Sequence, residues 1–128
     1  MRAVDTNILV RLITRDDVKQ AARADAFIEG GAWVSHIVLV ETTWVLKSVF
    51  DLEDERIQAV LDTLLGHVHL SIQEPDVVNA ALEEYRKRPA LGFSDCLIVV
   101  VARKAGHVPI GTFDKGLAKL SDTQRLSP

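Results

Sequence analysis

Four acidic residues lie at the ends of predicted strands or in the first turns of predicted helices: Asp5, Glu41, Asp95 and Asp114. Four carboxylates brought within a few ångström of one another repel strongly unless a cation supplies opposite charge. A set of oxygen donors suits Mg²⁺ or Mn²⁺ better than Zn²⁺, which prefers nitrogen and sulfur. Such ions activate water and neutralise phosphate, so the pattern predicts metal-dependent hydrolysis of a phosphodiester.

The first acid follows a short apolar run near the start of the chain. Ala3 and Val4 predict a strand that delivers Asp5 to the rim of a sheet. A helix is expected directly afterwards, because Thr6 and Asn7 can cap its free N–H groups and the apolar residues that follow recur with helical period. The alternative is that Asp5 is only part of a helix cap.

The last acid stands in a similar position. Residues 107–111 predict a short strand, and residues 112–116 predict the turn that leaves it, so Asp114 also arrives just past a strand end. The carboxyl ends of parallel strands meet at one edge of a sheet, where ligands bind. Asp5 and Asp114 are therefore expected at the same edge.

Glu41 belongs to a predicted helix over residues 36–50, with Ser35 as its N-cap. It shares a helical face with apolar residues, which places a carboxylate toward the interior. The other members of that face are Ile37, Val40, Trp44, Val45 and Ser48. Burying an unpaired carboxylate is costly, so Glu41 needs either a cation such as a metal ion or a buried salt bridge to an arginine.

Asp95 opens the helix expected over residues 92–106. The apolar run from Cys96 to Val101 could be a strand by composition, but it continues into a basic last turn and a glycine, which favours a helix. Asp95 shares a face with Ile98, Val99 and Ala102, so a second carboxylate is expected to point inward.

Strands alternate with helices along the rest of the chain. Helices are expected over residues 16–28, 53–65 and 75–87, strands over 32–34 and 67–72, and a short helix and an edge strand at the C-terminus. This alternation predicts an α/β fold, a three-layer α/β/α sandwich around a central, mostly parallel sheet. On that fold all four acids can converge on one edge.

Three other residues invite a functional interpretation. His67 and His69 would share one face of their strand and could form a metal pair, or could simply lie on its wetter side. Cys96 lies beside Asp95, but no local motif supports a nucleophile, and we interpret it as a packed apolar residue.

The composition suits one globular domain over residues 1–128, with 48% apolar and 26% charged residues. No stretch approaches the roughly 20 apolar residues that span a bilayer, and no signal peptide is expected because polar residues interrupt the first apolar segment. A single cysteine excludes an internal disulfide and fits the reducing cytoplasm.

The net charge of −3 argues at first against a nucleic-acid partner. If four of the 18 acids hold metal, however, 14 remain against 15 Lys and Arg residues. Basic stretches at residues 11–19, 86–88 and 103–104 could then contact phosphates, although such residues are often only a solvated helix face.

Four motifs, in order and at similar spacing along the whole chain, together resemble a known family. They are Val-Asp-Thr-Asn at residues 4–7, Val-Leu-Val-Glu-Thr-Thr-Trp-Val-Leu at 38–46, Gly-Phe-Ser-Asp-Cys-Leu-Ile at 92–98 and Gly-Thr-Phe-Asp-Lys-Gly-Leu at 111–117. This set is similar to PIN-domain ribonucleases, and most of all to VapC-like toxins of bacterial and archaeal toxin–antitoxin pairs.

The resemblance implies that Asp5, Glu41, Asp95 and Asp114 form an acidic Mg²⁺ site, with Mn²⁺ as a substitute. Asn7 and Thr112 match polar positions that orient metal-bound water or the carboxylates. Asp114 matches the least regular of the family's acids. The resemblance also implies an RNA substrate, a homodimer and inhibition by a small antitoxin protein. The composition, as described above, predicts a cytoplasmic protein without membrane contact.

Two other functions are compatible with parts of the pattern. A phosphatase or phosphotransferase would use Asp5 as its nucleophile, but a second acid two residues later is replaced by Asn7, and Glu41 would have no role. A non-catalytic RNA-binding or interaction module would use the acids only to hold a structural metal or to repel charge.

Overall fold

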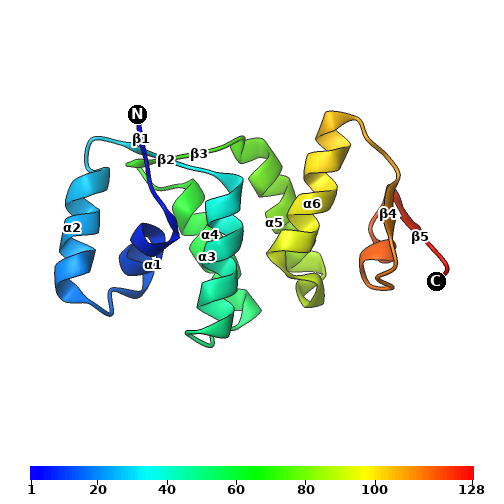
Figure 1. The fold of residues 1–128 in the computed structure, drawn as a ribbon, viewed down its shortest axis with the longest axis horizontal. Helices are drawn as coiled ribbons and strands as arrows, with labels where there is room; N and C mark the ends of the chain where they lie inside the picture. The colour runs from blue at the N-terminus through cyan, green and yellow to red at the C-terminus, as the bar shows by residue number, and fades with distance from the viewer. The chain divides into compact units, whose positions relative to one another are not determined.

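A computed structural model describes residues 1–128 and divides them into two units, Met1–Pro75 and Asp76–Pro128. In the first unit a pair of helices separates each strand from the next, and in the second unit helical elements precede and separate two strands (Figure 1). No helix is long and apolar enough to cross a membrane.

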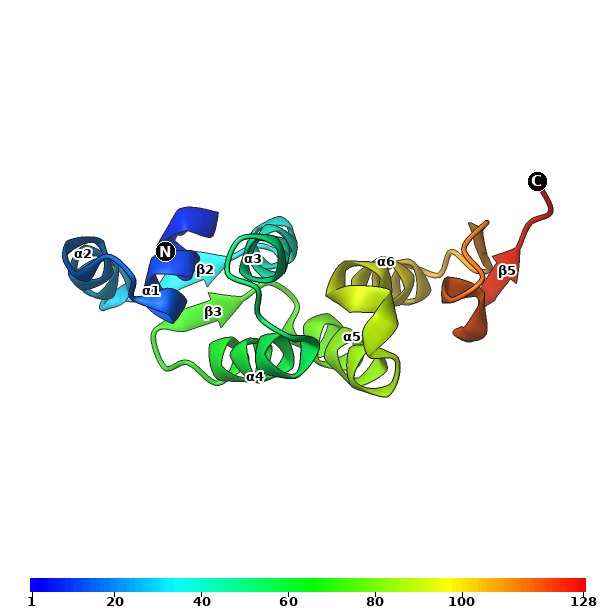
Figure 2. The ribbon, with the colours of Figure 1, turned by 90° about the horizontal axis from the view of Figure 1, so that it is seen from below.

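The first unit is built on a three-stranded parallel sheet in the order β1-β2-β3. Figure 2 shows α1 and α3 on one side of these strands and α4 on the other. The elements of this unit are β1 (Arg2–Ala3), α1 (Thr6–Thr14), α2 (Val18–Ile28), β2 (Ala32–Val34), α3 (His36–Ser48), α4 (Asp54–Leu65) and β3 (Leu70–Ile72).

The second unit combines helices with a two-stranded parallel sheet. Its elements are α5 (Pro75–Lys87, which starts at the last residue of the first unit), the 3-10 turn η1 (Pro89–Leu91), α6 (Gly92–Ala105), β4 (Ile110–Thr112), η2 (Leu117–Lys119) and β5 (Thr123–Arg125). Ile110 pairs with Thr123 and Thr112 with Arg125. The α/β class and the parallel strands predicted from the sequence are confirmed in both units.

The helix boundaries follow from local chemistry. Asp17 and Ser35 cap α2 and α3, accepting hydrogen bonds from the backbone N–H of Gln20 at 3.0 Å and of Val38 at 3.1 Å. Gly106 ends α6 with a φ of 84°, a left-handed conformation that glycine adopts without a steric cost. The helices predicted over residues 16–28, 36–50, 53–65, 75–87 and 92–106 are confirmed as α2 to α6, with ends that differ from the predicted ones by at most two residues.

The strands β3 and β4 both begin later in the chain than the sequence predicted. The strand predicted over 67–72 begins at Leu70, and the one predicted over 107–111 runs over Ile110–Thr112. The reason is the length of their partners: Ala32 opens β2 and pairs with Leu70, so nothing extends the ladder to His67. In the second unit Thr112 pairs with Arg125 of β5, so it is the last residue of β4 and not the first residue of the turn.

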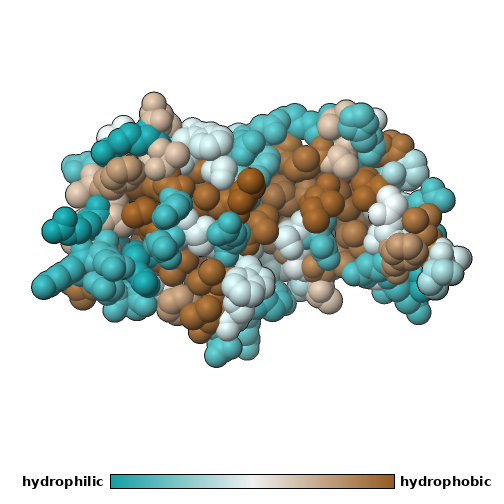
Figure 3. Space-filling view, in the orientation of Figure 1, coloured by the Kyte–Doolittle hydropathy of each residue, from teal (hydrophilic) through white to brown (hydrophobic).

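The face of α3 that packs into the protein differs from the predicted one. Leu39, Thr42, Thr43 and Leu46 are buried. Ile37 and Trp44 are 71% and 67% exposed, and apolar residues show on the side of α3 that faces the viewer in Figure 3. Because the helix carries apolar side chains all round, its periodicity favours no single face.

Candidate metal centre

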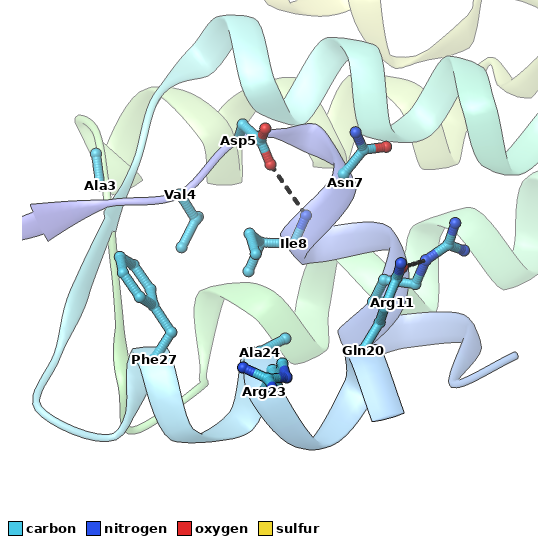
Figure 4. Close-up of a pocket in the computed structure, with 10 residues that line it drawn as sticks. All are labelled: Ala3, Val4, Asp5, Asn7, Ile8, Arg11, Gln20, Arg23, Ala24 and Phe27. Carbon is cyan, nitrogen blue, oxygen red and sulfur yellow. Dashed lines mark hydrogen bonds between the residues drawn. The ribbon is translucent and has the colours of Figure 1, made fainter. Parts of the chain in front are cut away.

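The N-terminal end of α1 places Asp5. Asp5 follows β1 after one buried residue, Val4, and has the extended backbone of an N-cap. Its Oδ1 accepts a hydrogen bond from the backbone N–H of Ile8 at 3.1 Å (Figure 4). The cap is thus Asp5 itself, and the prediction that Thr6 and Asn7 cap this helix was wrong. The cap uses one carboxylate oxygen, so Oδ2 has no protein partner.

A hydrogen bond between distant residues connects this helix end to α3. The Thr6 hydroxyl donates to Oε2 of Glu41 at 3.0 Å, across 35 residues of sequence. Glu41 lies in the second turn of α3, not the first, and is exposed. Its carboxylate therefore accepts a hydrogen bond from Thr6 and is open to solvent, and the alternative of a buried salt bridge to an arginine is wrong.

Asn7 is exposed in the first turn of α1, two residues after Asp5 in the sequence. It and Asp5 line a cleft between α1 and α2 (Figure 4). The first unit therefore brings Asp5, Thr6 and Glu41 together through one backbone cap and one side-chain hydrogen bond. The contact of Thr6 with Glu41 is what the sequence did not indicate, since the sequence suggested Thr6 only as a helix cap next to Asp5.

The second unit holds the other two acids. Asp95 lies in the first turn of α6 and is partly buried, while its helix neighbour Val99 is fully buried and Ile98 is 56% exposed. Burial raises the pKa of the Asp95 carboxyl above its ordinary value, and the negative charge of Asp114 raises this pKa further. Asp95 is thus only partly directed inward, and it is electrostatically coupled to Asp114.

Asp114 lies in the turn after β4 and organises that turn. Its Oδ1 accepts hydrogen bonds from the backbone N–H of Gly116 at 2.7 Å and of Leu117 at 3.2 Å. Its own backbone N–H donates to Oγ1 of Thr112 at 2.9 Å. Thr112 therefore fixes the backbone that carries Asp114, and Oδ2 of Asp114 has no protein partner.

None of the four acids pairs with a lysine or arginine, whereas several other acids do so, among them Asp16, Asp25 and Asp76. Within neither unit do three or more His, Cys, Asp or Glu side chains gather in a cluster able to hold a metal ion. The donor chemistry nevertheless fits a hard divalent cation, because each unit offers carboxylate oxygens that carry negative charge without a protein counterion.

The other candidates have structural roles. His67 and His69 precede β3, and the backbone N–H of His69 donates to Nδ1 of His67 at 3.1 Å, so they form a local turn contact. Cys96 is fully buried in α6, and burial raises its thiol pKa to about 11. The interpretation of Cys96 as a packed residue is confirmed, because only the thiolate is a strong nucleophile.

These features define an α/β protein with parallel strands, in which four acids without a basic partner lie just after a strand or in the first two turns of a helix. A family model described as PIN domain matches residues 2–122, and the chain therefore belongs to the PIN domain family. A VapC ribonuclease from Aquifex aeolicus (strain VF5) is 26% identical over 125 residues, which cover 94% of this chain and 92% of that protein.

Proposed function

We propose that this protein is a metal-dependent endoribonuclease in which Asp5, Glu41, Asp95 and Asp114 form one acidic site within a single PIN-like domain over residues 1–128. The family match across both units supports this proposal, as does the similarity to a protein named as a ribonuclease. The observation that carries it is the match of the PIN domain family model to residues 2–122, and no lysine or arginine is paired with any of the four carboxylates in place of a metal ion.

The divalent ion, Mg²⁺ or Mn²⁺, would supply a water nucleophile at neutral pH and neutralise charge on the phosphate. Asp5 and Asp114 would each offer Oδ2 to it, since Oδ1 of each accepts backbone hydrogen bonds. Those bonds fix both carboxylates, so little side-chain freedom is lost when they bind. Thr6 would orient Glu41, Asn7 would offer its side-chain amide beside Asp5, and Thr112 would hold the turn of Asp114.

Asp95 would have a different role from the other three acids. Its pKa is raised by burial and by Asp114, so it holds a proton more readily than an ordinary aspartate while no cation is present. A bound cation would favour its ionised form and remove the repulsion from Asp114. We therefore assign Asp95 to holding the ion and not to the attack on phosphorus.

The direct test is cleavage of total cellular RNA by purified protein with Mg²⁺, with Mn²⁺ and with EDTA. Asp5→Asn should abolish cleavage, and Glu55→Gln, which removes an exposed acid on α4, should leave it unchanged. Cleavage without added metal, or full activity of Asp5→Asn, would refute the proposal. A phosphorylated Asp5 trapped with a phosphate ester would support a phosphotransferase, and metal-independent binding of RNA without cleavage would support a binding module.

We further propose that the protein is the toxin of a toxin–antitoxin pair, acts in the cytoplasm as a homodimer and is inhibited by a small antitoxin. The similarity to a VapC ribonuclease over nearly the whole chain supports this extension. Induced expression in a bacterial host should stop growth, and Asp5→Asn should not. Light scattering of the purified protein should give twice the mass of one chain, and a monomeric mass would contradict the dimer.

A further inference from the structure

A cleft between α1 and α2 adjoins the end of the helix that Asp5 caps. It has a volume of about 710 Å³ and contains Asp5 and Asn7 at the start of α1 and Gln20, Arg23 and Phe27 along α2 (Figure 4). This volume is ample for a nucleotide-sized ligand, since ligand sites commonly enclose roughly 300–1,000 Å³. The cleft lies entirely within the first unit.

Two arginines line this cleft, and they differ in what holds them. Arg11 donates through Nε to Gln20 at 2.6 Å and through Nη1 to Asp16 at 2.8 Å, so its guanidinium is fixed and partly neutralised. Arg23 is exposed and has no hydrogen bond or ion pair. Arg23 is therefore a cation without a counterion on the wall of a cleft. A phosphate could accept charge-assisted hydrogen bonds from its guanidinium.

The remaining lining of the cleft is apolar. Ala3, Val4, Ile8, Ala24 and Phe27 contribute it. The Phe27 ring is only partly buried, and the Arg2 guanidinium lies over one face of it, 3.9 Å from the ring centroid. A bare phosphate ion would gain nothing from this surface, whereas the base of a nucleotide could cover it while its phosphate meets an arginine. Single-stranded nucleic acid is commonly bound through this combination of basic groups and apolar or aromatic surface.

We infer that the α1–α2 cleft is a binding subsite for single-stranded RNA, in which Arg23 contacts a phosphate. The inference rests on the proposed function for its occupant, because the cleft contains Asp5 and a strand bound in it would run up to that carboxylate. Arg23 is then a binding residue, and Arg11, which is held by Asp16 and Gln20, shapes the cleft and adds positive charge.

The test is fluorescence anisotropy of a labelled RNA of roughly 12 uridines in EDTA, at a series of salt concentrations. Arg23→Ala should weaken binding about 5- to 10-fold and reduce the slope of log K against log salt by roughly 0.7, the value for one phosphate contact to a single strand. Arg56→Ala is the matched control, because Arg56 is equally an exposed arginine but lies on α4, outside this cleft. It should change binding less than about twofold.

Asp5→Asn provides a second readout of the same cleft. In EDTA it should tighten RNA binding, because it removes a negative charge from the end of the cleft that a phosphate approaches. Equal losses for Arg23→Ala and Arg56→Ala, an unchanged salt slope for Arg23→Ala, or binding of an acidic peptide but not of RNA would overturn the inference. Binding is measured here without metal, so it is independent of the cleavage assay with Mg²⁺ or Mn²⁺. If Asp5→Asn loses cleavage in that assay while Arg23→Ala binds RNA like the wild type, the proposed function stands and this subsite does not exist.

Discussion

Replacing Asp5 by alanine and by asparagine should separate the two roles that its carboxylate combines. One oxygen caps α1 through the 3.1 Å bond from the N–H of Ile8, and the other is the proposed metal ligand. Asparagine caps helices about as well as aspartate, whereas alanine forfeits about 1 kcal/mol. Both variants should lose cleavage, but only alanine should lower the free energy of unfolding substantially.

The size of the stability effect can be worked out from the helix. Asp5→Ala loses the cap and also the favourable interaction of a negative charge with the positive end of the helix, which contributes about 0.3–1 kcal/mol. Asp5→Asn loses only the second contribution. For a chain of 128 residues, a loss of about 1 kcal/mol lowers the melting temperature by roughly 4 °C. Asp5→Ala should therefore melt roughly 4 °C below Asp5→Asn when both are measured in EDTA.

Asp17→Ala is the control for this comparison. Asp17 caps α2 through the N–H of Gln20 at 3.0 Å, so the same substitution should have a similar stability cost. It should leave RNA cleavage intact, because Asp17 is not one of the proposed metal ligands. Equal melting temperatures for Asp5→Ala and Asp5→Asn would refute the cap, and an active Asp5→Asn would refute the metal role.

Three other predictions test the interior and the second unit. Leu46→Ala should cost about 2–5 kcal/mol in urea unfolding because Leu46 is fully buried, while Trp44→Ala should cost less than about 0.5 kcal/mol; the reverse order would restore the face predicted from sequence. Cys96 should resist iodoacetamide at pH 7.5 until urea unfolds the chain, because its pKa is about 11 and it is buried, and rapid alkylation of folded protein would contradict this. Asp95→Asn should abolish cleavage and raise the melting temperature in EDTA at neutral pH. Since the pKa of Asp95 is raised in the folded state, the folded wild type binds this proton more tightly than the unfolded chain, so its stability should fall as pH rises from the ordinary aspartate pKa through the raised one. Asp95→Asn should lack that part of the pH dependence, and identical pH profiles would contradict the assignment.

Helix positions and fold class were predictable because they depend on short-range chemistry. Capping residues such as Asp17 and Ser35 bond to N–H groups three residues away, and Gly106 supplies the left-handed conformation that ends α6. The alternation of these helices with apolar runs was sufficient to predict an α/β protein with parallel strands. The four acids were also identifiable from sequence, although their joint metal site stays a prediction.

The extent of each strand could not be read from the sequence, because a strand lasts only as long as its partner. The alternation of His67 to Ile72 predicted six residues, but β2 offers a partner only to the last three. The hydrogen-bond partner of Glu41 could not be predicted either, because Thr6 lies 35 residues away in the sequence and only the packing of α1 on α3 brings the two residues together.

The sequence by itself determined the helices, the cap of α3 at Ser35, the parallel α/β class and the set of acids, because each of these depends on neighbours within a turn or on the polarity of single residues. Only the tertiary structure decided which face of α3 is buried, where β3 and β4 begin and that Arg23 faces a cleft without a counterion. These features depend on the surfaces that distant segments present to one another. A helix with apolar residues on every side gives no local signal of which side will be buried.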